Sequence, residues 1–240
     1  MGIKSMTEGQ IEGMYSHPGN APEYSFEKIE PLAGSPLKGK TICVLGSSVM
    51  NGSGAENFAV AEYLAARLGC EYTKSAVDGT TLVDEGEESY IKRLRRLNKT
   101  ERYDVFICQL STNDAWYEKP LGYISRPDYE LEDFDTHTVT GALEYIITYV
   151  GDNWDCPLFF LTSAQTFESK TYGPMVARLK DLQAKYRFGI IDLWSDVMFN
   201  NISKEQLDLY ITEEVHPTMA GYRDWWGPEI EKQLLGELYL

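Results

Sequence analysis

A serine and a histidine, far apart in the chain, are the residues best suited to chemistry in this sequence. Ser48 follows a short apolar run, and His216 follows two glutamates late in the chain. A serine hydroxyl is a poor nucleophile until a base takes its proton, and histidine has the unperturbed pKa, about 6.5, that suits the task. His17 and His137 lie in irregular segments. We therefore expect His216 to activate Ser48.

A carboxylate near the histidine would complete a catalytic triad. Glu213 stands three residues before His216, so on one turn it would lie against Nδ1, fix the tautomer and leave Nε2 facing Ser48. Glu214 is the alternative acid. Pro217 restricts His216 to extended backbone conformations. The segment 213–217 is thus predicted to orient an imidazole.

Acyl transfer also needs donors directed at the oxyanion of a tetrahedral intermediate. The backbone N–H of Ser48, the backbone N–H of Gly79 and the side-chain amide of Asn113 are the candidates. Glycine at position 79 lets a backbone N–H approach without an obstructing side chain. Losing one such donor typically costs about 10²–10³ in rate.

Residues 115–137 form the longest predicted connection and are rich in aromatic side chains. Long loops in compact domains are often functional, and this one begins beside Asn113. Trp116 and Tyr117 are candidate substrate-binding residues that would stack on a sugar ring. The alternative, given equal weight, is that these aromatics cover a small hydrophobic cluster.

Five short apolar runs separated by helical patterns must position these residues. Continuously apolar strands joined by helices indicate right-handed crossovers, hence a parallel sheet covered by helices on both faces. Ligands bind such sheets beyond the carboxyl ends of the strands, where the candidate residues fall. The predicted strands are residues 41–45, 72–77, 104–110, 157–162 and 189–193.

The chain is predicted to hold an irregular N-terminal arm, residues 1–38, and a single domain, residues 39–240. The arm contains four of the ten prolines and no sustained periodicity. Helical faces begin near Phe58, Val139 and Met175, and Gly69 can end the first of these helices. In the last helical segment, Gly227-Pro228 should cause a kink or a restart.

Composition excludes several classes of protein. The 37 acidic and 22 basic side chains give a formal charge of −15, which argues against a nucleic-acid partner. No apolar run approaches the roughly 18 residues of a membrane span. The N-terminal segment has no secretory pattern, so we expect a cytoplasmic protein, or a secreted one whose signal has been removed.

The four cysteines are predicted to be reduced core thiols, because they are few and contain no CxxC pair. Three scattered histidines and a single Glu-x-x-His do not suggest a metal site. We expect neither a metal nor a cofactor. The sequence does not indicate the oligomeric state.

The ordered set of motifs resembles the SGNH or GDSL hydrolases, esterases and acylhydrolases of flavodoxin-like αβα fold. Ser48 matches the nucleophile of the first block, Gly79 the glycine of the second, Asn113 the asparagine of the third and His216 the base of the last. The resemblance covers residues 40 to about 235. It implies a three-layer αβα sandwich with a five-stranded parallel sheet and an esterase active site.

The chain departs from the family pattern at three positions. Ser47 stands where the first block usually has aspartate, and Ser111 stands where the third block usually has glycine. Glu213 replaces the usual aspartate three residues before the histidine. The added methylene of Glu213 changes the geometry of the triad acid.

We expect a serine esterase or acylhydrolase that cleaves a short-chain acyl ester, with a carbohydrate scaffold favoured, by Ser-His-Glu acyl transfer to water. Its partner would be a small-molecule or carbohydrate ester. One alternative is a flavodoxin-like small-molecule binding protein, whose bound flavin would be yellow. Another is a catalytically inactive hydrolase relative, which a turnover assay would identify. In the blandest interpretation, Ser48 only caps a helix and His216 only forms a surface ion pair.

Overall fold

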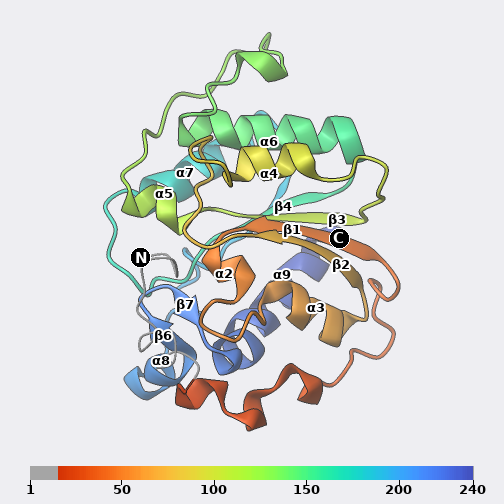
Figure 1. The fold of residues 1–240 in the computed structure, drawn as a ribbon, viewed down its shortest axis with the longest axis vertical. Coiled ribbons are helices and arrows are strands. Elements are labelled where there is room, and N and C mark those ends of the chain that lie inside the picture. Colours follow the sequence, from red (N-terminus) through yellow and green to blue (C-terminus); the bar gives the residue numbers. More distant parts are fainter. Residues whose placement is uncertain (1–15, 240) are drawn as a thin grey trace.

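A five-stranded parallel sheet forms the centre of the molecule (Figure 1). The computed structural model describes residues 16–239. The strand order is β2-β1-β3-β4-β5, the order of flavodoxin-like doubly wound folds. This confirms the predicted parallel sheet, and each predicted strand agrees with an observed one to within two residues at either end. The strands are β1 (Thr41–Gly46), β2 (Glu71–Ala76), β3 (Val105–Gln109), β4 (Leu158–Leu161) and β5 (Gly189–Ile191).

Helices cover both faces of this sheet, which confirms the three-layer sandwich. Figure 1 shows α4 (Tyr90–Arg96), α6 (Val139–Trp154) and α7 (Tyr172–Leu182) on one face. The other face carries α2 (Ser48–Asn51), α3 (Val60–Leu68) and α9 (Gly227–Leu238). The remaining helices include α5 (Thr112–Trp116), which follows β3, and α8 (Lys204–Tyr210), which follows β5.

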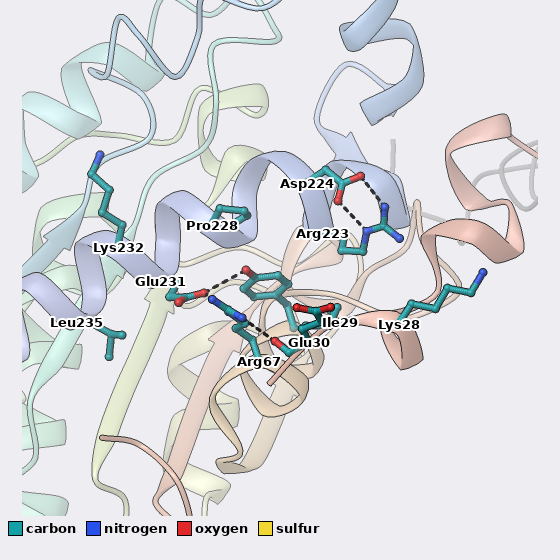
Figure 2. Close-up of a pocket in the computed structure, with 11 residues that line it drawn as sticks. Lys28, Ile29, Glu30, Arg67, Arg223, Asp224, Pro228, Glu231, Lys232 and Leu235 are labelled. Carbon is teal, nitrogen blue, oxygen red and sulfur yellow. Dashed lines mark hydrogen bonds and ion pairs between the residues drawn. The ribbon is translucent and has the colours of Figure 1, made fainter. Parts of the chain in front are cut away.

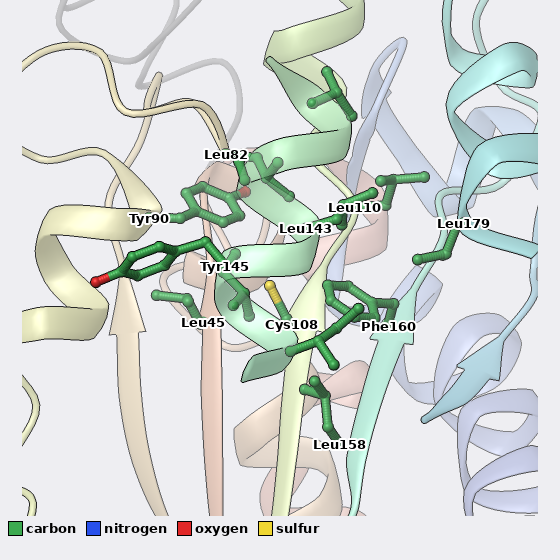
Figure 3. Packing of buried hydrophobic residues seen from close by; sticks show 14 of the residues in the cluster. Leu45, Leu82, Tyr90, Cys108, Leu110, Leu143, Tyr145, Leu158, Phe160 and Leu179 are labelled. Carbon is green, nitrogen blue, oxygen red and sulfur yellow. The ribbon is translucent and has the colours of Figure 1, made fainter. Parts of the chain in front are cut away.

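Alternate side chains of β1, β3, β4 and β5 enter separate hydrophobic cores, whereas the side chains of the edge strand β2 are exposed or half-buried. Leu45 and Cys108 pack with the helices α4, α6 and α7 (Figure 3), whereas Val44 and Ile107 pack with α3 and α9. This alternation is the pleat of a strand whose two faces are both buried. All four cysteines are free, and only Cys156 is not fully buried, which agrees with the predicted core thiols. The apolar strand sequences are thus explained by burial on both sides.

The helix ends follow the glycine and proline signals in the sequence. Gly69 caps α3 in a left-handed conformation, with φ of 70°. The final helical segment begins as a π-helical stretch, η6 (Gly221–Trp226), and restarts as α9 at Gly227-Pro228. This confirms the predicted restart, because proline is tolerated in the first turn of a helix.

The described part of the predicted arm contains three short 3-10 helices, η2 (Pro18–Asn20), η3 (Pro22–Tyr24) and η4 (Phe26–Lys28), followed by turns and irregular structure in residues 29–38. Residues 1–15 of the predicted arm lie outside the described residues. Phe26 is buried, and its ring lies 5.4 Å from that of Phe58, between centroids. The arm therefore contributes to the core on the α3 side of the sheet.

A cavity of about 430 Å³ lies where this arm meets α3 and α9 (Figure 2). Arg67 of α3 donates to the carboxylate of Glu231 in α9 at 2.9 Å and to the backbone carbonyl of Glu30 at 2.6 Å. Arg223 pairs with its neighbour Asp224 at 2.7 Å. Arg67 therefore joins the arm, through the Glu30 carbonyl, to α3 and α9 at this cavity.

Residues 211–217 form an element that the sequence analysis did not predict. Glu213 and His216 were expected on one turn, and they flank the two-residue turn of a small antiparallel hairpin of β6 (Ile211–Glu213) and β7 (His216–Pro217). The hairpin is a separate two-stranded sheet, and it lies beside α2 (Figure 1). Glu213 is paired with His216 across it.

Candidate active site

The candidate nucleophile lies at the turn between β1 and α2. Ser48 is the first residue of α2 and only 4% of its surface is exposed. Gly46 makes the turn possible, because a Cβ there would come within 2.3 Å of the Met50 side chain and 2.8 Å of Gln109 Oε1. The turn therefore requires glycine and places the serine at the carboxyl end of the sheet.

The candidate base comes from the β6–β7 hairpin. His216 is 5% exposed, and its Nε2 lies 2.8 Å from Ser48 Oγ. The chain passes very close behind the imidazole, since a Cβ added to Gly54 would lie 3.0 Å from the Cβ of His216. The structure thus brings together two side chains that are 168 positions apart in the sequence.

Burial determines the protonation of this histidine. It lowers the pKa of His216 from 6.5 to about 4, and the negative charge of Asp78 opposes part of that fall. The imidazole is therefore neutral at physiological pH, which is the form that can accept a proton from Ser48. Asp78 itself accepts hydrogen bonds from Asn51 at 2.9 Å and from Ser53 at 2.6 Å.

The second imidazole nitrogen is left without a hydrogen bond. Among the described residues, nothing bonds to His216 Nδ1, although the atom is buried. Glu213 and Glu214 instead line the adjoining cavity. The structure therefore does not bring either candidate acid to the imidazole, and the role of Glu213 stays a prediction.

The three candidate oxyanion donors follow three neighbouring strands. Ser48 N–H belongs to the first turn of α2, where backbone N–H groups have no partner within the helix. Gly79 follows β2 and has φ of 71°, a left-handed conformation that glycine adopts freely. Asn113 lies in α5 just beyond β3, and its Nδ2 donates to the carbonyl of Thr80 at 2.8 Å. That bond uses one amide hydrogen and leaves the other available.

A buried arginine that the sequence analysis did not identify holds two of these segments together. Arg93 of α4 is 4% exposed, and its Nη2 donates to the carbonyl of Gly46 at 2.6 Å and to the hydroxyl of Thr80 at 3.2 Å. Its Nη1 donates to the carbonyl of Ser75. Arg93 therefore connects the ends of β1 and β2 and the segment after Gly79.

Two further buried side chains, also not predicted, fix the nucleophile turn and the asparagine. Gln109 at the end of β3 accepts a hydrogen bond from Ser47 N–H at 2.9 Å. Asp114 accepts from the backbone N–H groups of Leu82 and Val83 at 2.7 and 3.0 Å, and burial raises its pKa to about 6. Asp114 adjoins Asn113, so its position in that motif was the available sequence signal.

A cavity of about 830 Å³ opens beside Asn113 and His216. Trp116 and Phe167 both line it, and 60% of the surface of Trp116 is exposed. Tyr117, 51% exposed, lines a neighbouring cavity of about 520 Å³ together with Gly79. Both rings are therefore accessible from a cavity, and their role in substrate binding stays a prediction.

The other two histidines have partners of their own. His17 caps η2 through its Nδ1, and His137 is exposed beside Asp135, so neither adjoins Ser48. Among residues 16–239, no group of three or more side chains is arranged to hold a metal ion. No helix in that same range combines the length and the apolar character needed to span a bilayer.

Comparison with known proteins identifies the family. Residues 44–223 match the model of the GDSL-like Lipase/Acylhydrolase family. The chain belongs to this family, and the protein is a hydrolase that acts on ester bonds. No curated protein matches the sequence.

Solved structures share the fold. A protein from Lactobacillus plantarum superposes with a TM-score of 0.70 at 20% identity, over 85% of this chain and 99% of that one. Phospholipase A1 from Streptomyces albidoflavus NA297 gives 0.57 at 14% identity, over 81% and 99%. A carbohydrate esterase family 2 enzyme from Corynascus thermopiles, solved with its carbohydrate binding domain, gives 0.55 at 16% identity, over 88% and 69%.

The lowered pKa of His216 predicts an unusual pH profile. A protonated imidazole cannot accept the proton of Ser48, so kcat/KM, which reports the free enzyme, should stay constant from neutral pH to about pH 5 and fall below about pH 4. Steady-state hydrolysis of an aryl acetate between pH 3.5 and 8 measures this. An acid limb near pH 6.5 or above would contradict the buried, neutral imidazole.

Proposed function

We propose that the protein is a serine esterase in which Ser48 and His216 carry out acyl transfer to water. The observation that carries this proposal is the 2.8 Å contact between Ser48 Oγ and His216 Nε2, at the edge of the sheet where ligands bind. The contact joins the two protein groups between which the proton must pass, a nucleophile and its base. The family match supplies the reaction class, ester hydrolysis.

In the proposed mechanism, Ser48 Oγ attacks the ester carbonyl carbon while its proton passes to His216 Nε2. The tetrahedral intermediate collapses, and the departing alcohol takes the proton from Nε2. Water then attacks the acyl-enzyme, gives a proton to Nε2, and releases the carboxylic acid as that proton returns to Ser48 Oγ. The neutral imidazole of the resting enzyme is the form that begins each half of this cycle.

The oxyanion is proposed to be held by Ser48 N–H, Gly79 N–H and the free amide hydrogen of Asn113. The bond from Asn113 to Thr80 supports this role, because it fixes the direction in which the second hydrogen points. Arg93 supports it as well, since it joins the carbonyl of Gly46 to the hydroxyl of Thr80. Preorganised donors of this kind are the main source of transition-state stabilisation in acyl transfer.

Glu213 is proposed as the acid that stabilises the imidazolium once substrate is bound. It is paired with His216 across the hairpin, and residues paired in this way project from the same face. Catalytic hydrogen bonds that are missing from an unliganded enzyme can form in the substrate complex. Glu214, exposed at the turn of the hairpin, provides the matched comparison.

The two alternatives raised by the sequence, a flavin carrier and an inactive relative, are less well supported than an active esterase. The family match supports an enzyme and gives no support to a flavin carrier. An inactive relative would have no need to keep a serine and a histidine in contact at 2.8 Å inside a buried site. A turnover assay distinguishes the active enzyme from the inactive relative.

The proposed substrate is a short acyl ester of an uncharged, carbohydrate-like alcohol. Trp116 and Phe167 line the cavity and offer aromatic faces of the kind on which sugar rings stack. Phe167 is held in place by the rings of Tyr172 and Trp194, at centroid distances of 5.3 and 5.5 Å. A fixed aromatic face loses little conformational entropy when a ligand binds.

The charge of the cavity supports an uncharged substrate. Its charged lining consists of Glu118, Glu168, Glu213, Glu214 and Lys170. Four carboxylates against one ammonium give a negative potential, and the chain as a whole carries −15. Such a potential lowers the local concentration of anionic esters near the cavity. It also repels anionic lipid surfaces.

Substitution of the nucleophile tests the proposed reaction. The wild-type protein should hydrolyse an aryl acetate and take up one equivalent of a serine-directed phosphonate. Ser48→Ala should lower kcat/KM at least about 10³-fold and take up no label, because no other group performs the attack. Ser47→Ala is the matched control and should still be labelled. An active Ser48→Ala protein, or a labelled peptide without Ser48, would refute the proposal.

Glu213→Gln and Glu214→Gln test the proposed acid. If Glu213 reaches Nδ1 in the substrate complex, it raises the pKa of His216 there, so the acid limb of kcat should lie at higher pH than that of kcat/KM. Glu213→Gln should remove this difference and lower kcat, whereas Glu214→Gln should preserve it. The two pH profiles of each variant provide the measurement, and equal effects of the two substitutions would argue against Glu213.

A panel of esters tests the proposed substrate. Acetyl to dodecanoyl esters of one neutral alcohol vary the acyl length, and acetyl esters of neutral and carboxylate-bearing alcohols vary the charge. We expect the neutral acetyl ester to be preferred about fivefold or more over its anionic counterpart at low ionic strength, and added salt to narrow the gap. Glu168→Lys should also reduce the preference for the neutral ester, because it replaces a negative charge of the cavity lining with a positive one.

Two results from this panel would contradict the substrate proposal. One is activity that rises steadily beyond about C8, because added methylenes gain only where an apolar pocket buries them. The other is a preference of the wild-type enzyme for the anionic ester at low ionic strength.

A further inference from the structure

One side chain of the N-terminal arm is bonded to both of the segments that carry Ser48 and His216. Asn20, at the end of η2, is 7% exposed. Its Nδ2 donates to the carbonyl of Gly54 at 2.8 Å, and its Oδ1 accepts from the N–H of Met219 at 2.8 Å. The two bonds are buried and use both ends of one amide group.

The Gly54 bond fixes the segment that follows the candidate nucleophile. This segment is continuous with α2, because Ser53 N–H donates to the carbonyl of Ser48 at 3.1 Å. It also packs directly on the histidine: a Cβ at Gly54 would lie 2.7 Å from the carbonyl oxygen of Pro217 and 3.0 Å from the Cβ of His216. A shift of Gly54 would therefore displace the backbone and the Cβ that carry the imidazole of His216.

The Met219 bond fixes the segment that follows the candidate base. Thr218 N–H donates to the carbonyl of Tyr210 at 2.8 Å, which closes the base of the hairpin. Gly19 of the arm packs against this base, since a Cβ there would lie 2.4 Å from the Thr218 hydroxyl. The arm therefore packs closely against the base of the hairpin that carries His216.

These two segments need such a connection because, within residues 16–239, no sheet hydrogen bond joins them. Ser48 follows the five-stranded sheet, whereas His216 belongs to the separate two-stranded sheet. An amide can donate from one atom and accept at another, which neither a carboxylate nor an aliphatic side chain can do. Asparagine is therefore well suited to bridge a carbonyl and an N–H.

We infer that Asn20 is a positioning residue that sets the distance between Ser48 Oγ and His216 Nε2 by bonding to Gly54 and Met219 at once. The inference rests on the proposed function of these two residues. Asn20 touches neither reacting atom. It acts through the backbone segments that follow Ser48 and His216. In this way the arm becomes a part of the catalytic structure.

Asn20→Asp tests the inference with almost no change of shape. The carboxylate keeps the acceptor for Met219 but loses the donor to Gly54 and faces its carbonyl. Because small displacements of catalytic groups cost up to about 10² in rate, we expect kcat per phosphonate-labelled site to fall about 10- to 100-fold. KM should change less than twofold, since Asn20 does not line the cavity. The rate of phosphonate labelling should fall by the same factor as kcat.

Asn20→Ala provides a second variant that buries no charge, in case the aspartate prevents folding. Asn200→Asp is the matched control: its amide likewise joins two segments, donating to the carbonyl of Leu193 and accepting from Gln165 N–H, both at 2.8 Å. Expressing kcat per labelled site, with thermal unfolding measured for each variant, removes any contribution from unfolded protein.

The possible results separate this inference from the function it rests on. A selective fall of kcat and labelling rate in both Asn20 variants, absent from Asn200→Asp, supports it. A kcat per labelled site within twofold of wild type, or a fall matched by Asn200→Asp, overturns it. A wild-type protein without esterase activity or label would instead refute the proposed function itself.

Discussion

The contact between Ser48 Oγ and His216 Nε2 is the interaction on which the rest of the site depends. It joins two segments 168 positions apart and is almost entirely buried. Burial lowers the pKa of His216 to about 4, which keeps the imidazole neutral and able to accept a proton. The same burial leaves Nδ1 without a partner among the described residues, a cost that a carboxylate would remove. The resting site is therefore a serine–histidine pair in which one hydrogen-bonding position remains open.

Holding this pair requires connections that the parallel sheet does not provide by itself. The sheet places Ser48 and Asn113 at one edge, after β1 and β3. Arg93 then ties the nucleophile turn to the segment after Gly79. Asn20 is proposed to do the same between the nucleophile and the histidine hairpin. Each of these buried polar groups is hydrogen-bonded, which makes it directional and lets it specify one arrangement.

The sequence was sufficient for the fold because four of its five strands are largely apolar, and because Gly69 and Gly227-Pro228 mark the end of α3 and the start of α9. It also indicated Ser48 and His216 as a pair, since Ser48 follows a parallel strand, where ligands bind, and histidine is the residue type that can activate a serine. It did not reveal the hairpin: Glu-x-x-His is compatible with a helical turn and with a two-residue connection, and only tertiary packing distinguishes them. Arg93 and Asn20 were missed because their residue types are usually exposed, and their bonds go to backbone groups whose positions no sequence pattern encodes.

The central claim, that these residues form one esterase site, is tested most directly by a crystal structure of the protein after reaction with a phosphonate. The account predicts phosphorus bonded to Ser48 Oγ, with His216 Nε2 adjacent. One phosphonyl oxygen should lie about 2.7–3.1 Å from Ser48 N, Gly79 N and Asn113 Nδ2. Phosphorus on another side chain, or a phosphonyl oxygen directed away from all three donors, would contradict it.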